Sequence, residues 1–127
     1  TCASGAGERY TPNTTSYGMA KAAIINLTRT CAMELGKYGI VTNCFNPVAT
    51  NDYFEKQEGG AALPVDFMNM MSPVGRLGGA YKDVSPILAF LASEEGGYIN
   101  GQIIDVCGGI SYTSPATVMG FLANKSK

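Results

Sequence analysis

Two short apolar runs, at residues 40–45 and 102–106, constrain the fold of this chain most strongly. Each run has few polar positions and is followed by a turn signal, Asn46-Pro47 or Gly108-Gly109. Such runs are typical of strands that are buried on both faces of a parallel sheet. Residues 17–35 and 82–93, which come before them, carry apolar side chains at helical spacing. The order of helix, strand, helix and strand predicts an α/β fold with a parallel sheet.

Two strands do not form a stable sheet by themselves, so their apolar faces need further neighbours. The chain opens with Thr1 rather than Met, and residues 1–5 resemble the end of a strand that enters a loop. We therefore expect the N-terminal half of the domain to lie outside these 127 residues. Residues 51–80 have weak periodicity, several glycines and three methionines, which predicts an insertion with short helices.

Composition argues against nucleic-acid and membrane partners. Charged residues make up 15% of the chain, and the formal net charge is −1, so no excess of positive charge attracts phosphates or anionic lipid. Apolar runs such as residues 87–92 are far shorter than the roughly 20 residues that span a bilayer. No signal peptide opens the chain. We expect a small-molecule partner, with no nucleic acid and no membrane.

The chain has four cysteines and no histidine. No two cysteines have the C-x-x-C spacing of zinc or redox motifs, so we expect no metal site. Free, partly buried thiols are typical of a reducing compartment, which predicts a cytoplasmic location.

Tyr17 and Lys21 lie four residues apart at the start of the first helix, about 6 Å apart along one face. An ammonium group stabilises a nearby phenolate, and such a tyrosine can exchange protons with an alcohol or ketone oxygen. Alone, the pair is a weak signal, because tyrosine and lysine often share a helix surface at this spacing. Ser4, thirteen residues earlier, either orients a substrate oxygen or is an ordinary loop residue.

Ser4 followed by Tyr17-Gly-Met-Ala-Lys21 is similar to the catalytic arrangement of the short-chain dehydrogenase/reductase family. Further stretches resemble that family's motifs in the same order: GIVTNCFNP at 39–47, SPVGRLG at 72–78, then FLAS, YINGQ and Gly-Gly within 90–109. The likeness covers residues 1 to about 112. It implies the C-terminal portion of a Rossmann-like, doubly wound parallel sheet. In that fold, residues 1–127 form the catalytic half of an NAD(P)-binding domain, and residues 51–80 form a substrate lid.

The resemblance implies an oxidoreductase that moves hydride between NAD or NADP and a secondary alcohol or ketone. Tyr17 would donate or accept the proton, Lys21 would favour the phenolate and bind the nicotinamide ribose, and Ser4 would orient the substrate oxygen. The choice between NAD and NADP is not readable from these residues. The Gly-rich phosphate turn of such folds is expected upstream, so we expect this chain alone to be inactive.

The resemblance also places the backbone at Pro47, Val48 and Thr50 against the nicotinamide, and three positions near it depart from the family pattern. Val48 replaces a usual glycine and would crowd the turn if that position needed a positive φ. Asp52 replaces a common threonine, and its carboxylate would repel a pyrophosphate. Cys107 replaces the usual aspartate before Gly-Gly.

Three other interpretations compete with the dehydrogenase reading. One is an unrelated α/β binding module with chance motif matches, which the number of matches in the same order argues against. A non-catalytic member of the same fold, acting as a sensor or interaction protein, is the main alternative. A sugar-nucleotide epimerase would need a larger C-terminal substrate domain than the 18 residues after Gly109.

Members of the family often assemble through the helix that carries the tyrosine and lysine, so we expect a homodimer or homotetramer at full length.

Overall fold

The computed structural model describes residues 1–9, 12–50, 65–114, 116–117, 119–120 and 123. The chain begins with the short helix η1 (Gly5–Gly7) and the long helix α1 (Thr15–Leu35), followed by η2 (Gly36–Tyr38). The central elements are β1 (Cys44–Pro47), β2 (Ala49–Thr50), α3 (Val65–Met71) and β3 (Gly78–Gly79). The last are η3 (Ala80–Val84), α4 (Ser85–Leu91), η4 (Glu94–Gly96), β4 (Ile103–Val106) and η5 (Ile110–Tyr112).

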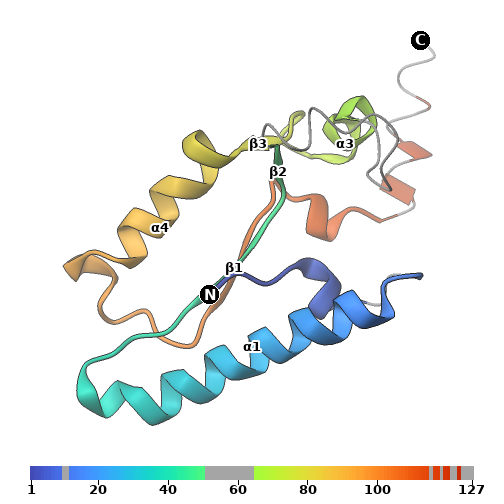
Figure 1. The fold of residues 1–127 in the computed structure, drawn as a ribbon. Coiled ribbons are helices and arrows are strands. Elements are labelled where there is room, and N and C mark those ends of the chain that lie inside the picture. The colour runs from blue at the N-terminus through green and yellow to red at the C-terminus, as the bar shows by residue number, and fades with distance from the viewer. Residues whose placement is uncertain (10–11, 51–64, 115, 118, 121–122, 124–127) are drawn as a thin grey trace.

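The main sheet is parallel, as the sequence predicts. β1 pairs with β4 in a register that runs from Cys44 opposite Ile103 to Pro47 opposite Val106. Cys2 forms a parallel bridge to Phe45, so the segment before η1 lies on the other side of β1. Helices α1 and α4 lie on opposite sides of these strands (Figure 1). The arrangement of helix, sheet and helix confirms the α/β prediction.

The first strand begins later than predicted, at Cys44 instead of residue 40. Side-chain amides take part in the pairing before that point. The Thr42 N–H donates to Asn100 Oδ1 at 2.8 Å, and Asn43 Nδ2 donates to the carbonyl oxygen of Ile99 at 2.6 Å. The Gly101 N–H also donates to the Thr42 carbonyl oxygen at 2.9 Å, so this stretch follows the neighbouring segment through a mixture of backbone and side-chain bonds before the regular ladder begins at Cys44.

The second predicted helix, residues 82–93, begins and ends two residues earlier in the structure. It begins as a π-helical turn in η3 and continues as α4. Pro86 lies in the first turn of α4, as expected for a residue that has no N–H to donate.

Helix α1 begins two residues before its predicted start. The spacing predicts an apolar stripe on it, Ala20, Ala23, Ile24, Leu27, Cys31 and Leu35, of which only Ile24, Cys31 and Leu35 are half-buried in the structure. Ile25, Thr28 and Ala32 are buried, whereas Leu27 is 55% exposed. Thr28 can be buried because its hydroxyl donates to the carbonyl oxygen of Ile24 at 2.8 Å. Periodicity alone favoured the larger apolar side chains, although the polar threonine satisfies its own hydrogen bond inside the helix.

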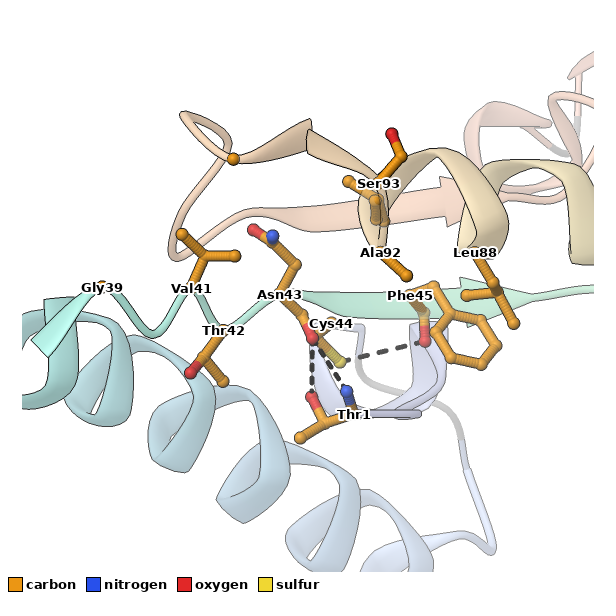
Figure 2. Close-up of a pocket in the computed structure, with 12 residues that line it drawn as sticks. Thr1, Gly39, Val41, Thr42, Asn43, Cys44, Phe45, Leu88, Ala92 and Ser93 are labelled. Carbon is orange, nitrogen blue, oxygen red and sulfur yellow. Dashed lines mark hydrogen bonds between the residues drawn. The ribbon is translucent and has the colours of Figure 1, made fainter. Parts of the chain in front are cut away.

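A groove of about 520 Å³ lies between α4 and the start of β1 (Figure 2). Thr1, Asn43, Leu88 and Ala92 line it, and the Thr1 ammonium donates to the Asn43 carbonyl oxygen at 2.8 Å. Open α/β sheets bind ligands beyond the carboxyl ends of their strands. This groove lies at the amino end of β1, so it is not the candidate active site.

A bidentate ion pair fastens the turn that leads into α4. Arg76 Nη1 and Nη2 each donate to one carboxylate oxygen of Asp83 at 2.7 Å. The Gly79 N–H donates to Asp83 Oδ2, also at 2.7 Å. Hydrogen bonds from Arg76 and Gly79 hold the pKa of the Asp83 carboxyl well below its ordinary value of 3.8.

Replacing Asp83 with Asn should destabilise the protein at neutral pH, and the difference should shrink in acid. A carboxyl whose pKa is lowered by folding stabilises the fold above its unfolded pKa, and this contribution is lost as the pH falls below about 4. Urea unfolding of wild type and D83N at pH 7 and pH 3 measures the effect. D66N, which removes an exposed carboxylate from α3, is the control. An equal D83N defect at both pH values would contradict the ion-pair explanation.

Candidate active site

Ser4 lies where the sheet ends and η1 begins. Just before it, the Ala3 N–H donates to the carbonyl oxygen of Phe45 at 3.0 Å, which fixes the segment along β1. Ser4 has extended backbone angles and caps η1, with its Oγ accepting from the Ala6 N–H at 3.2 Å. Among the described residues, no acceptor takes the hydroxyl hydrogen of Ser4. That hydrogen can be donated to a substrate oxygen.

The structure brings Lys21 next to Tyr17. The Lys21 Nζ lies 5.6 Å from the centroid of the Tyr17 ring, and it donates to the Cys2 carbonyl oxygen at 3.3 Å. The Tyr17 side chain is 49% exposed. Its hydroxyl makes no hydrogen bond with any residue in the described part of the chain. The ammonium group therefore joins the face of α1 that carries Tyr17 to the strand end that carries Ser4.

Gly7 sets how closely the loop after Ser4 approaches α1. A Cβ atom at Gly7 would lie 2.7 Å from the carbonyl carbon of Lys21 and 2.8 Å from the amide nitrogen of Ala22. These are backbone atoms inside a helix, so they cannot move aside easily. Only glycine permits this approach, which places Ser4, three residues earlier, close to the helix that carries Tyr17.

The segment expected to face a nicotinamide leaves the sheet beside these groups. The Val48 N–H donates to the Val106 carbonyl oxygen at 2.9 Å, and Thr50 Oγ1 donates to the Gly78 carbonyl oxygen at 3.3 Å. Among the described non-glycine residues only Asn13 has a positive φ, so Val48 fits its position without the strain considered above. Asp52 lies outside the described residues.

A small cavity of about 130 Å³ lies against the same segment. Its walls come from Pro47, Val48 and Ala49, together with Met68 of α3 and the buried Leu77. Residues 51–64 of the expected lid lie outside the described part of the chain. The remaining part, from α3 to Gly79, thus contributes one apolar wall beside Val48.

Sequence reasoning missed a polar contact beneath the loop that joins Ser4 to Tyr17. Arg9 Nη2 pairs with Asp105 Oδ2 at 2.8 Å, and the buried Asn46 lies between Asp105 and Glu8. One signal was available: Asp105 is a charged residue in a strand otherwise expected to be buried, and such residues are nearly always paired. The partners could not be identified, because they are far apart in the sequence.

In the described residues, no group of three or more His, Cys, Asp or Glu side chains is placed to hold a metal ion. Within the same residues, every helix is too short or too polar to cross a membrane.

Comparison with known proteins identifies the family of this chain. A family model described as enoyl-(acyl carrier protein) reductase matches residues 1–111. The chain belongs to the short-chain dehydrogenase/reductase family. It is 41% identical to human (3R)-3-hydroxyacyl-CoA dehydrogenase over 98 residues. This aligned stretch covers 76% of this chain and 36% of the human protein. It is 40% identical over 100 residues to a chloroplastic NADPH-dependent aldehyde reductase-like protein of Arabidopsis thaliana, covering 77% and 36%.

The fold of this dehydrogenase/reductase chain also matches solved structures. The structure of ElxO with NADP bound superimposes with a TM-score of 0.75 at 28% identity, covering 86% of this chain and 44% of that one. The chain therefore spans a little over a third of the human relative and under half of ElxO.

Replacing Gly7 with Ala should destabilise the protein by about 1–3 kcal/mol, because the added methyl group meets the backbone of α1. Thermal unfolding measures this loss. Gly36→Ala is the matched control, since a Cβ there meets only Asn100 Nδ2 at an ordinary 3.4 Å. If both variants unfold at the wild-type temperature, the close approach of η1 to α1 is wrong.

Proposed function

We propose that the protein containing this chain is an NAD(P)-dependent oxidoreductase that interconverts a secondary alcohol and a ketone. The observation that carries the proposal is the Lys21 ammonium group 5.6 Å from the ring centroid of a half-exposed Tyr17. Membership of the family and likeness to a protein with bound NADP support it. Because the chain spans 36% of the human relative, the activity is proposed for the longer protein.

The reacting groups have separate tasks. During reduction, Ser4 donates a hydrogen bond to the substrate carbonyl oxygen, and Tyr17 gives its hydroxyl proton to the same oxygen. Lys21 stabilises the phenolate that remains on Tyr17. In the opposite direction, the phenolate takes the proton from the alcohol. The nicotinamide supplies or accepts the hydride when it is bound.

The residues of this chain fit one end of such a cofactor. Lys21 would hold the nicotinamide ribose, and the backbone of Pro47, Val48 and Thr50 would lie along the nicotinamide. The backbone of Val48 suits this task because its bond to Val106 holds the segment at the sheet. In this proposal, residues 1–127 are the catalytic half of the domain, and residues 51–80 cover the substrate. The choice between NAD and NADP belongs to other residues.

A tyrosine pair in this chain tests the proposal. In the full-length protein, Tyr17→Phe should lower kcat about 10²–10⁴-fold, because the proton donor is lost. Tyr38→Phe is the matched control: Lys37 Nζ lies 5.0 Å from that ring centroid, so it has a similar cation neighbour outside the site. Stopped-flow absorbance of the reduced nicotinamide, with a panel of secondary alcohols and ketones, measures both. A wild type that binds cofactor without turnover would favour the sensor or interaction protein instead.

We also propose that the full-length protein is a cytoplasmic homodimer or homotetramer that uses the outer side of α1. Met19, Leu27 and Met33 are exposed apolar residues on this helix, and all four cysteines are free. Analytical ultracentrifugation should show a dimer or tetramer for wild type and a smaller species for Met33→Glu. Tyr98→Glu, which changes an exposed aromatic outside α1, should leave the mass unchanged. A monomeric wild type would refute this assembly.

A further inference from the structure

Four polar side chains from three segments meet below the loop that follows Ser4, and we call them the Asn46 network. Asn46 Nδ2 donates to Glu8 Oε2 at 2.9 Å and to Asp105 Oδ1 at 3.0 Å. Arg9 Nη2 donates to Asp105 Oδ2 at 2.8 Å. Asn46 is 2% exposed, and the Asp105 side chain is 12% exposed. The centre of the network, Asn46 and Asp105, therefore lies largely out of water, where hydrogen bonds to charged groups are strong, while Glu8 is exposed and the Arg9 side chain is 40% exposed.

The network connects the parts that the proposed reaction must keep in register. Asn46 and Asp105 are opposite each other in the β1–β4 pair, and Asn46 directly precedes Pro47. Glu8 and Arg9 follow η1, the short helix capped by Ser4. A single asparagine amide thus ties the loop after Ser4 to the strand that leads to the nicotinamide segment.

The network is also connected to helix α1, which carries Tyr17 and Lys21, through the glycine next to Glu8. Gly7 is bonded to Glu8 in the chain and lies against the backbone of Lys21, where even a Cβ atom would come within 2.7 Å. Displacement of Glu8 would therefore shift Gly7 against α1 at Lys21. Because this contact is between backbones, side-chain rearrangement cannot absorb the shift.

The hydrogen bonds of Asn46 are not those of a residue chosen for stability alone. Both of its N–H donors are turned to carboxylates, while its Oδ1 is buried and has no partner among the described residues. An unsatisfied buried oxygen destabilises a fold. Departures from the rule that buried polar atoms are hydrogen-bonded are expected at functional sites. The geometry favours a role in which holding Glu8 and Asp105 matters more than satisfying that oxygen.

We propose that Asn46 is a positioning residue, which acts through Glu8 to hold Ser4 and Tyr17 at one substrate oxygen. Asp105 and Arg9 hold the asparagine and the loop from the other side. This inference rests on the proposed oxidoreductase function. Asn46 does not touch the substrate or the cofactor, so its loss should lower kcat and leave the affinity for the cofactor unchanged. The Val48 N–H keeps its bond to the Val106 carbonyl oxygen, and the Thr50 hydroxyl keeps its bond to the Gly78 carbonyl oxygen.

The test compares Glu8→Ala with Glu8→Gln in the full-length protein. Glu8 is exposed, so neither variant threatens the core, and both remove the charge. Only glutamine keeps an oxygen that can accept from Asn46. E8A should lower kcat about tenfold or more, the effect of a small misplacement of reacting groups. E8Q should stay within about threefold of wild type, and the cofactor Kd of both should stay within about twofold.

Asn46→Ala should show the same separation, with a lower kcat and an unchanged cofactor Kd. Glu34→Ala, which removes an exposed carboxylate from α1 far along the helix, should leave kcat unchanged. Thermal unfolding accompanies each measurement, so that kcat is compared at a temperature where every variant is folded. If N46A does not fold, the E8A and E8Q pair still decides the question.

The outcomes separate this inference from the function on which it rests. Wild-type turnover with an unchanged kcat in E8A would overturn the positioning role alone. An equal loss of kcat in E8A and E8Q would also overturn it, because charge rather than the hydrogen bond would then matter. A wild type that transfers no hydride to any alcohol or ketone would overturn the proposed function and this inference together.

Discussion

Backbone hydrogen bonds between β1 and β4 place Asn46 beside Asp105 and bring Pro47 and Val48 to the same end of the sheet. In a parallel pair, both chains leave the sheet at that end, and their carboxyl ends face the space where ligands bind in this class of fold. The bridge from Cys2 to Phe45 adds a third chain in the same direction. Ser4 therefore leaves the sheet at the edge where the segment that is proposed to face the nicotinamide begins.

Local features of the fold were predictable from the sequence. The spacing of Tyr17 and Lys21 placed them on one face of a helix, because four residues make about one turn in any α-helix. The start of β1 was not predictable, since the side-chain amides of Asn43 and Asn100 supply several of the bonds that join residues 42–43 to the neighbouring segment. The buried face of α1 was predicted only in part. Nothing in the apolar pattern shows that Thr28 bonds to its own helix and becomes buried.

In the candidate site, too, features that depend on neighbouring residues were predictable, and contacts between residues far apart in the sequence were not. Its proposed reacting groups lie within the first 21 residues, and the chemistry proposed for them follows from residue type and helical spacing. The groups that hold them are remote in the sequence: Asn46 is 38 positions from Glu8 and 59 from Asp105. Such pairs depend on strand register, which a single sequence does not specify. Asp105 alone carried a sign of its role, as a carboxylate in an apolar strand.

The two short strands β2 and β3 have a consequence for how such proteins diversify. Ala49 pairs with Gly78 and Thr50 with Gly79, so the chain leaves the sheet and returns at one point. An excursion whose ends are joined at its base can change in length at small entropic expense, since each doubling adds only about 0.6 kcal/mol. The connection between Thr50 and Gly78 can therefore change in length without disturbing the β1–β4 pair. In the proposed enzyme, substrate preference can change there while Tyr17 and Lys21 on α1 stay untouched.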